Sequence, residues 1–466
     1  MVRAAECCCA LFSLGVLNLC TGYGGAISVY FGLSVGLQLL DVSFFNLVLQ
    51  SNVFTNCLVS SNPSFGGNVY GGAVSLYVGG YSSFRSQNGA AMAAVGDTVV
   101  RNVSVNLNTA QFTSCSAMSS HNGSRPRGAN AYGGSFSFYI GAYAWSSSVA
   151  ASSSSACGTT TASVVNISVS NASSSNCRAV TTASGGSASL GANSYGGSMS
   201  VWYVGAYAWS NSNAASSNST CETSTASAVS ISISNTPSSN CSAVTATGAG
   251  GSYGANSYGG SMSVVYVGAY AWSFSNATST SSACGATNAS AVSISISNAH
   301  SYNCSAVTTT SGSFGSNGAN SYGGSMSVVY VGAYAWSSSF ASSSSSTCGT
   351  TTASGVRVNI SNAPAYNCSA VTATVGGQSS GANSYGGSMS VVYVGANAWN
   401  LNIGSLFSNS ASFCDLTRTT ELFILMNAST FSDSLSLSRK LCCLIETAVQ
   451  ISSSILEPQK PQVADL

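Results

Sequence analysis

Apolar and polar residues alternate along several stretches of the chain, as in an extended strand that buries one face. In VSLYV at residues 74–78, Val74, Leu76 and Val78 share one face and Ser75 lies on the other. The stretch AVSISISNA at residues 291–299 alternates in the same way. Nothing in these stretches requires a helix, so the pattern predicts an all-β fold.

The alternating stretches recur at a regular interval. The phrase GGSMSVVYVGAYAWS at residues 259–273 returns unchanged at 323–337. The Gly-Gly pairs that open this phrase and its variants begin at residues 24, 71, 133, 196, 259, 323 and 386. From the second pair onward the interval is nearly constant, and a period of this kind is typical of solenoids and propellers.

Each repeat contains landmarks about 20 residues apart, such as Gly259, Cys284, Cys304 and Gly323. Asparagine follows a similar stride of 20 to 22 residues, at Asn171, Asn193, Asn213, Asn235, Asn256, Asn276, Asn298 and Asn320. Asparagine tolerates the left-handed conformation, and its amide can bond to the coils on either side. We therefore predict a single-stranded right-handed parallel β-helix with about three coils per 63-residue repeat.

Three short motifs resemble those of a known family. GGAI at residues 24–27, GGAV at 71–74 and FTNC at 54–57 resemble the repeats of polymorphic outer-membrane-protein-type β-helices. More broadly, residues 22–400 resemble pectin-lyase-like right-handed β-helices, and the resemblance implies that fold. The alternative is a β-propeller, because Gly-Gly pairs followed by Tyr and Trp resemble kelch blades, although kelch repeats are shorter, at about 50 residues.

The pattern divides the chain into three parts. Residues 1–21 fit either a signal peptide or a truncated start, since Arg3 precedes an apolar run from Cys7. Residues 22–410 form the predicted β-helix, and residues 411–466 a C-terminal cap or non-repeat tail. In the tail, residues 434–456 have helical spacing and predict a helix that covers the open end of the solenoid.

From Gly196 onward the recurring phrase gains one residue between Gly-Gly and Trp. An extra residue within an alternating strand predicts a β-bulge. We place it near Trp202, Val265, Val329 and Val392.

Charge is scarce, and this limits the possible functions. Only 5% of residues are charged and the net charge is +1, which gives no electrostatic footprint for nucleic acid. Asp41 and Asp97 are isolated, serine lacks a partner histidine and acid, and no cofactor motif occurs. No Cys-x2-Cys spacing recurs, and the only histidines are His121 and His300, which disfavours a metal site. We predict no enzyme, no cofactor and no metal.

The 17 cysteines favour an oxidising compartment because most of them fall at fixed positions of the repeat. On the three-coil count, two neighbouring cysteines of one repeat lie one coil apart and within disulfide range. The predicted pairs are Cys157 with Cys177, Cys221 with Cys241, Cys284 with Cys304, and Cys348 with Cys368. The alternative is a stack of buried thiols.

Twelve N-x-[ST] sequons agree with a secreted or cell-surface location, and no apolar run is long enough to predict a transmembrane segment. We predict glycosylation at Asn218, Asn276 and Asn288, which lie in serine-rich segments. Asn240, Asn303 and Asn367 each precede a cysteine, and we predict that a closed turn leaves these three largely unmodified.

Aromatic pairs close the recurring phrase. They are Tyr207 with Trp209, Tyr270 with Trp272, and Tyr334 with Trp336. Either these rings pack at a corner of the coil, or they form an exposed row that stacks on sugars. On the three-coil count, successive copies would lie roughly 14 Å apart.

These observations predict an extracellular or cell-surface structural and adhesive repeat protein without catalytic activity. The alternative is a carbohydrate-binding or polysaccharide-lyase-derived module, and the expected partners are polysaccharide or components of the cell wall or extracellular matrix. Ice binding by flat Ser/Thr rows is disfavoured, because on this count the rows recur only in every third coil.

Overall fold

The structure is a computed structural model of the 466-residue chain. It describes residues 27–426 apart from 36–40, 51–52, 62–67, 89–91, 96, 122–129, 151–153, 185–188, 191, 215–217, 249–251, 254, 278–280, 312–319, 342–345, 376–382, 404–413 and 422–423. The predicted start at residues 1–21 and the predicted helix at residues 434–456 lie outside the described residues.

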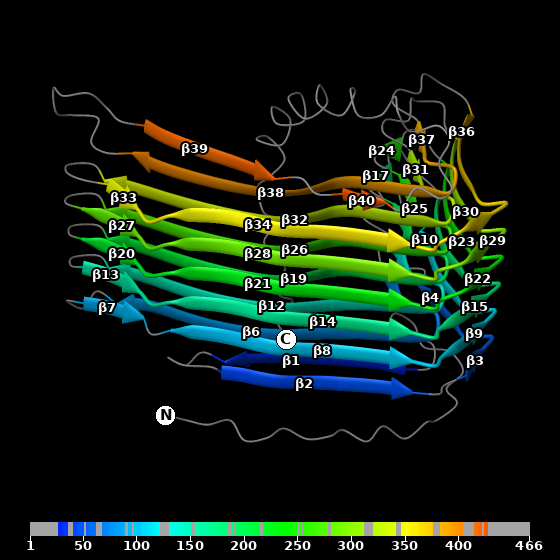
Figure 1. Cartoon of the computed structure of the whole chain (residues 1–466), viewed down its shortest axis with the longest axis horizontal. Coiled ribbons are helices and arrows are strands. Elements are labelled where there is room, and N and C mark those ends of the chain that lie inside the picture. The colour runs from blue at the N-terminus through cyan, green and yellow to red at the C-terminus, as the bar shows by residue number, and fades with distance from the viewer. Residues whose placement is uncertain are drawn as a thin grey trace. The chain divides into compact units, whose positions relative to one another are not determined.

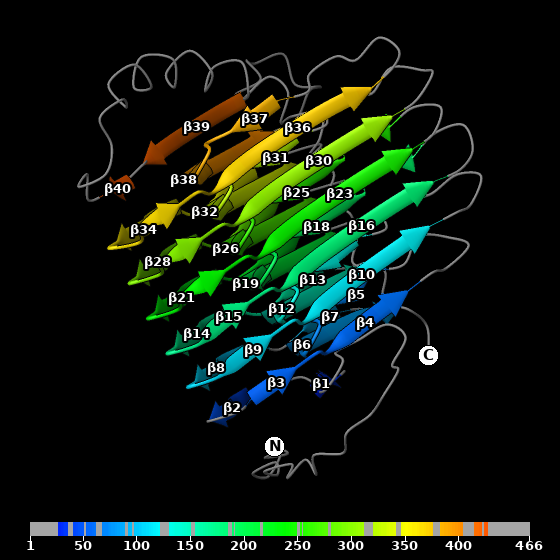
Figure 2. The same ribbon diagram turned by 90° about the vertical axis from the view of Figure 1, so that its right-hand side faces the viewer.

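The described residues form parallel strands stacked in successive coils, as in a parallel β-helix (Figures 1 and 2). Each strand pairs in register with the strand one repeat later. Phe136 pairs with Met199, Met199 with Met262, and Met262 with Met326. The all-β parallel β-helix is therefore confirmed. The antiparallel blades of the alternative propeller are not the arrangement found.

Two large sheets form the broad sides of the coil. The long sheet consists of β1 (Ile27–Val35), β6 (Val74–Asn88), β12 (Phe136–Ala150), β19 (Met199–Ala214), β26 (Met262–Ala277), β32 (Met326–Ala341), β38 (Met389–Ile403) and β39 (Cys414–Glu421). The opposite sheet consists of β2 (Asp41–Gln50), β8 (Thr98–Asn108), β14 (Thr160–Ser170), β21 (Ser224–Ser234), β28 (Thr287–Ser297), β34 (Thr351–Ser361) and β40 (Ile424–Met426).

Shorter strands complete each coil. A third sheet contains β4 (Leu58–Ser61), β10 (Ser116–His121), β16 (Arg178–Ser184), β23 (Ser242–Gly248), β30 (Ser305–Ser311) and β36 (Ser369–Val375). The strands just before the long sheet are β5 (Val69–Tyr70), β11 (Asn130–Tyr132), β18 (Asn193–Tyr195), β25 (Asn256–Tyr258), β31 (Asn320–Tyr322) and β37 (Asn383–Tyr385).

The corners carry the remaining strands. One corner has β3 (Val53–Thr55), β9 (Gln111–Thr113), β15 (Ser173–Ser175), β22 (Ser238–Ser239), β29 (Ser301–Tyr302) and β35 (Ala365–Tyr366). Another has β7 (Met92–Val95), β13 (Ser154–Cys157), β20 (Ser219–Cys221), β27 (Ser282–Cys284) and β33 (Ser346–Cys348). A two-stranded sheet joins β17 (Ser189–Leu190) to β24 (Ser252–Tyr253).

The predicted three coils per repeat are wrong, because one repeat makes one coil. The evenly spaced landmarks within a repeat mark different sides of the same coil: in the repeat from Gly133, β12, β14 and β16 lie in three different sheets. A coil made from a third of a repeat has no room for the 16-residue strand β26 together with two further sides.

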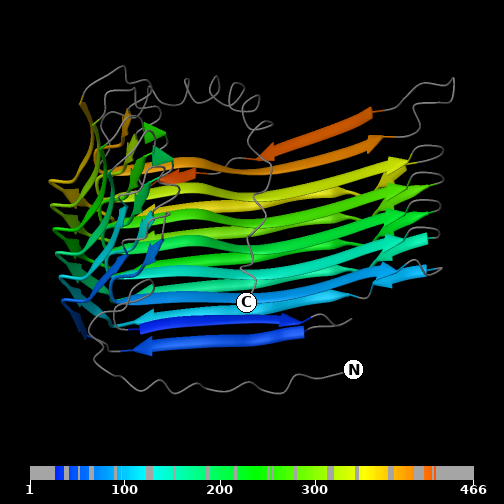
Figure 3. The same cartoon turned by 180° about the vertical axis from the view of Figure 1, so that it is seen from behind.

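The core lies between the long sheet and the opposite sheet, which contact each other through their inward side chains. From β12, Phe136, Phe138 and Ile140 are fully buried, and from β14 so are Val165 and Ile167. Strict alternation places these residues on one face of each strand, because successive side chains point to opposite faces. The long sheet, which is nearest the viewer in Figure 3, therefore has an inner apolar face, and its outer face is free to carry other residues.

Asparagines form columns, meaning sets of equivalent residues stacked in successive coils. Asn171, Asn235, Asn298 and Asn362 follow the opposite sheet with φ values of 46° to 52°. The Nδ2 atoms of Asn171, Asn235 and Asn298 each donate to the asparagine one coil earlier, at 3.0 to 3.2 Å. The left-handed turns and amide bonds between coils are thus confirmed, although the predicted asparagine stride joins three separate columns.

The predicted β-bulge is present in the long sheet. Where β19 pairs with β12, Val201 lies opposite Phe138 and Val204 opposite Ile140, so Trp202 and Tyr203 stand opposite Tyr139 alone. Tyr203, Tyr266, Tyr330 and Tyr393 have φ values of 56° to 61°. The extra residue is therefore absorbed by a left-handed residue one position after the predicted one.

The last coil has a strand that the sequence did not predict. β39 pairs antiparallel with β38, from Ala396 with Glu421 to Ile403 with Cys414. The sheet therefore continues beyond the predicted boundary at residue 410. The rest of the predicted tail lies largely outside the described residues.

The opposite sheet has a left-handed position at the same place in successive coils, and it gives a stability prediction. Val164 has a φ of 54° and a side chain 41% exposed, while Asn102 and Gly355 occupy the equivalent position in other coils. A β-branched residue in this conformation is strained, and the left-handed conformation costs an L-residue roughly 1–2 kcal/mol.

We predict that Val164→Asn raises the free energy of unfolding by about 1 kcal/mol, measured by chemical denaturation. The neighbouring control Val165→Asn, at a buried position, should lower it. A loss of stability in Val164→Asn would contradict the strain argument.

Candidate functional sites on the two broad faces

The outer face of the long sheet carries columns of aromatic rings. Trp145, Trp209, Trp272 and Trp336 stack with ring centroids 4.8 to 5.4 Å apart and ring planes within 15° of parallel. A neighbouring column of Tyr143, Tyr207, Tyr270 and Tyr334 has centroids 4.7 to 5.0 Å apart. Successive copies thus lie one coil apart, and the expected spacing of roughly 14 Å is wrong.

The stacking restricts what these rings can contact. Each ring inside a column presents both faces to the rings above and below, so only its edge points outward. The indole nitrogens of Trp209 and Trp272 are buried as well. Burial, and then the neighbouring tyrosines, raise the pKa of Tyr207 and Tyr270 well above the ordinary value, so both phenols are neutral. Contact with sugars through these residues stays a prediction, and the geometry confines it to ring edges.

A second aromatic group packs nearby on the long sheet. Tyr132, Tyr195 and Tyr258 stack at 4.7 to 4.8 Å and form a buried cluster with Val265 and Val329. Trp202 lies against this cluster, with its centroid 4.5 Å from that of Tyr132. The tyrosine before each Gly-Gly pair is thus a packing residue that joins the short strands preceding the long sheet to the bulged part of that sheet.

The outer face of the opposite sheet is different, and sequence reasoning did not single it out. Four outward columns on β14, β21, β28 and β34 carry uncharged polar residues, except Arg357, and all of these residues are partly or fully exposed; the left-handed position between the first two columns holds Val164, Ala228, Ala291 and Gly355. We call this surface the hydroxyl face. Its columns are Thr161, Thr225, Asn288 and Thr352; Asn166, Ser230, Ser293 and Arg357; Ser168, Ser232, Ser295 and Asn359; and Ser170, Ser234, Ser297 and Ser361.

The hydroxyl face is regular in two directions. Polar groups repeat every ~4.8 Å along the stack, the usual distance between paired strands, and every ~6.8 Å along the strand across the last three columns, where alternate residues point outward. In the sequence, the serine at every second position of AVSISISNA indicates only the outer face of a strand. Because each repeat forms a single coil, these serines of successive repeats lie side by side and form a two-dimensional array.

Charged side chains do not gather at one place among the residues whose side chains are described. Asp97, Arg101, Arg178, Glu222 and Arg357 are all exposed. Asp97 accepts a hydrogen bond from the Thr159 backbone at 2.8 Å, and Glu222 accepts one from the Thr159 hydroxyl at 2.9 Å. These two carboxylates therefore support a backbone turn.

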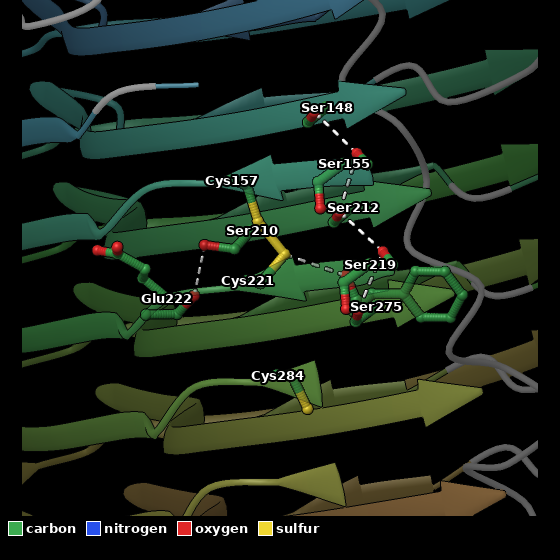
Figure 4. Close-up of a disulfide and its surroundings, with 12 residues drawn as sticks. Ser148, Ser155, Cys157, Ser210, Ser212, Ser219, Cys221, Glu222, Ser275 and Cys284 are labelled. Atoms are coloured by element: carbon green, nitrogen blue, oxygen red, sulfur yellow. Dashed lines mark hydrogen bonds between the residues drawn. A yellow bond between two sulfur atoms is a disulfide. The ribbon is translucent and has the colours of Figure 1, made fainter. Parts of the chain in front are cut away.

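The disulfides differ from the predicted pairs. Cys157 bonds to Cys221 (Figure 4), and Cys284 bonds to Cys348. The two cysteines of each pair are 64 residues apart, and their Cα atoms are 4.7 and 4.5 Å apart. Neighbouring cysteines of one repeat do not pair, because the step between them leads from one corner of the coil to another and not to the next coil. Cys177, Cys241, Cys304 and Cys368 belong to a separate column. Each disulfide closes a 64-residue loop, for which chain entropy predicts about 4 kcal/mol of stabilisation.

The interior beside the disulfides is polar (Figure 4). A chain of serine hydroxyls crosses three coils, with Ser282 bonded to Ser275, Ser275 to Ser219, and Ser219 to Ser212, at 2.8 to 3.1 Å. It continues through Ser155 to Ser148 at 3.0 and 2.8 Å. These buried hydroxyls satisfy one another, which offsets the cost of removing them from water.

The exposure of the sequon asparagines differs from the expectation. Asn240, Asn303 and Asn367 were expected in closed turns, but all three side chains are exposed. They stand in one column, joined by bonds from Asn240 N to Tyr302 O and from Asn303 N to Tyr366 O, both 2.9 Å. Asn218 is exposed, whereas Asn276 and Asn288 are half-buried. Glycosylation of Asn218, Asn276 and Asn288 stays a prediction.

Comparison with family models, with curated proteins and with solved structures finds no match. Within the described residues, no helix is long and apolar enough to cross a membrane. The fold and its two faces define a class: a parallel β-solenoid whose coils are joined by columns of equivalent side chains.

The tryptophan column yields a test of its structural role. Trp272 stacks on two parallel neighbours, whereas Trp399, at the end of the column, meets Trp336 edge-on at 87°. We predict that Trp272→Ala lowers the free energy of unfolding by about 3 kcal/mol, from lost burial and two lost ring contacts. Trp399→Ala, with one neighbour in this column, should cost about 1 kcal/mol. Denaturant titration of both variants measures the difference, and equal effects would show that stacking contributes little.

Proposed function

We propose that the chain is an extracellular or cell-surface structural protein that adheres to uncharged, hydroxyl-rich polymers through its hydroxyl face. The observation that carries the proposal is the repetition of uncharged polar residues at the outward positions of four consecutive strands. Polysaccharide is the partner class with matching chemistry, because its surface also consists of closely spaced hydroxyl groups without charge.

Adhesion through such a face is multivalent. A single hydrogen bond in water contributes only about 1 kcal/mol. When many groups are held on one rigid surface, each further contact forms within the complex, and the overall binding strengthens without any single strong contact. A sheet whose strands are fixed on both sides by hydrogen bonds keeps those groups in place, which limits the entropy lost on binding.

Columns on several sides of the coil support the structural half of the proposal. Aromatic rings, asparagine amides and two disulfides all connect one coil to the next. A repeat chain of this kind gains stability from each interface between neighbouring coils. These columns therefore supply rigidity, and the hydroxyl face supplies the contact surface.

The same repetition favours a second candidate, ice. On the three-coil count, the serine and threonine rows would recur only in every third coil, which disfavoured ice binding. The strand register instead places these rows in every coil. A flat lattice of hydroxyl groups could then hold water in a regular arrangement. The two candidates use the same face, so the same variants test both.

A charge placed on the hydroxyl face tests the proposal. Ser232 lies near the centre of the face, and Asn213 lies on the outer face of the long sheet in a neighbouring strand of the same coil. Because desolvating an unpaired charge is costly, Ser232→Glu should weaken binding to microcrystalline cellulose or chitin at least tenfold, as about 1.4 kcal/mol would require. The control Asn213→Glu should bind as the wild type does.

Depletion of the protein from solution by each insoluble polymer measures binding, and thermal hysteresis measures ice binding. If the wild type causes thermal hysteresis but does not bind the polymers, and Ser232→Glu abolishes the hysteresis, the ligand of the hydroxyl face is ice. A wild-type protein that shows neither activity, or equal loss in the two variants, would contradict adhesion through the hydroxyl face.

A further inference from the structure

Six cysteines form a second column that has no disulfide in the structure. They are Cys57, Cys115, Cys177, Cys241, Cys304 and Cys368, one in each of six successive coils. The four inner members are fully buried, and the two end members, Cys57 and Cys368, are partly exposed. The proposed adhesive function does not involve this column.

The backbone of the column matches that of the disulfide-bonded one. In the bonded column, the residue after each cysteine donates its N–H to the preceding cysteine: Glu222 to Cys157 O at 3.1 Å, and Gly349 to Cys284 O at 2.8 Å. In the thiol column, Arg178 N donates to Cys115 O at 2.9 Å, and Ser242 N to Cys177 O at 3.0 Å. Ser116, Ser305 and Ser369 continue the series at 2.8 to 3.0 Å.

Equivalent backbone pairing places the cysteine Cα atoms at the spacing of paired strands, about 4.8 Å. That spacing lies within the Cα–Cα range that disulfides span. The bonded column has Cα distances of 4.7 and 4.5 Å. All six side chains project from the same position of a parallel ladder. A disulfide between neighbours therefore needs rotation of the side chains and no movement of the backbone.

The sulfur atoms already lie between coils. The Cys177 thiol is within hydrogen-bonding distance of Ser175 O in its own coil, at 3.2 Å, and of Phe112 O in the preceding coil, at 3.8 Å. The Cys115 and Cys241 thiols in the coils on either side also lie near enough to lower the pKa of Cys177. Each inner sulfur thus has two neighbouring sulfurs as candidates for a bond.

We infer that this column is a site of oxidation that forms three further disulfides, Cys57–Cys115, Cys177–Cys241 and Cys304–Cys368. Only one pairing between neighbours uses all six thiols, and it begins with Cys57–Cys115. Every other pairing between neighbours leaves at least two cysteines reduced. The bonded column also pairs completely, because its two disulfides use all four of its cysteines.

The oxidant is a low-molecular-weight disulfide such as oxidised glutathione. The Cys57 thiolate attacks it, forms a mixed disulfide and releases one glutathione thiolate. The Cys115 thiolate then attacks the Cys57 sulfur, which closes the protein disulfide and releases the second glutathione. Each protein disulfide thus transfers two electrons to one oxidant molecule, and the two thiol protons go to solvent or to the glutathione thiolates.

Oxidation can enter at the exposed end of the column and pass inward. A hydrogen bond with Cys115 lowers the pKa of Cys57 to about 7, which supplies thiolate at neutral pH. The four inner cysteines are fully buried and do not meet a dissolved oxidant directly. They therefore react through exchange with a neighbouring disulfide, in which a thiolate attacks one sulfur and displaces the other.

Peptide mapping of the full chain tests the inference. The protein is produced in a secretory host, equilibrated with a mixture of reduced and oxidised glutathione, alkylated, and digested with pepsin at low pH, where disulfide exchange is slow. We expect all three new linkages in the same digest as Cys157–Cys221 and Cys284–Cys348. These two known linkages serve as the internal control for a folded, oxidised protein.

Two results would overturn the inference. One is alkylation of all six cysteines while the two control linkages are intact, which would show that the column stays reduced. The other is Cys115–Cys177 together with Cys241–Cys304, with Cys57 and Cys368 alkylated, which would refute the pairing.

A Cys177→Ser variant provides a second measurement, because serine preserves the packing and removes one sulfur. It should retain Cys57–Cys115 and contain one unpaired thiol among Cys241, Cys304 and Cys368, whereas three unpaired thiols there would contradict the inference.

Discussion

In-register parallel stacking places equivalent residues of successive coils next to one another, at about 4.8 Å. Every outward column must therefore consist of side chains that tolerate their own kind as neighbours. Two like charges at that distance repel by roughly 3 kcal/mol at an effective dielectric constant of about 20. This constraint explains why only 5% of the residues are charged. Arg101 pairs with Ser163, Arg178 with Ser242, and Arg357 with Ser293, so each of these charges has an uncharged neighbour.

The residues that replace charge are those that bind favourably to copies of themselves. Parallel rings stack, an amide donates to the next amide, hydroxyls form chains, and thiols form disulfides. In this protein each of these pairings occupies its own place on the coil: tryptophan and tyrosine on the long sheet, asparagine at the turns, serine inside, and cysteine at two corners. The proposed adhesive surface follows from the same rule, because uncharged hydroxyl groups can be repeated in every coil without cost.

Alternation and periodicity in the sequence were sufficient to predict the all-β parallel β-helix, the bulge after Val201 and the left-handed asparagines. They did not reveal the length of the coil. Asn171, Asn193 and Asn213 are spaced like successive coils, yet the first lies after β14, the second begins β18, and the third is near the end of β19. The disulfide pairing failed for the same reason. The informative feature was the period at which whole phrases repeat, because stacking requires equivalent residues as neighbours.

The central claim is that one whole repeat equals one coil, and deletion of a coil tests it most directly. Removing residues 260–323 joins Gly259 to Gly324 and takes out one complete repeat, whereas removing residues 260–280 takes out a third of one. Both proteins are unfolded by denaturant in the presence of reductant, so that disulfide pairing plays no part. We expect the larger deletion to retain its β-sheet circular dichroism and cooperative unfolding, and the smaller one to lose both. A stable protein after the smaller deletion, together with an unfolded one after the larger deletion, would contradict this account.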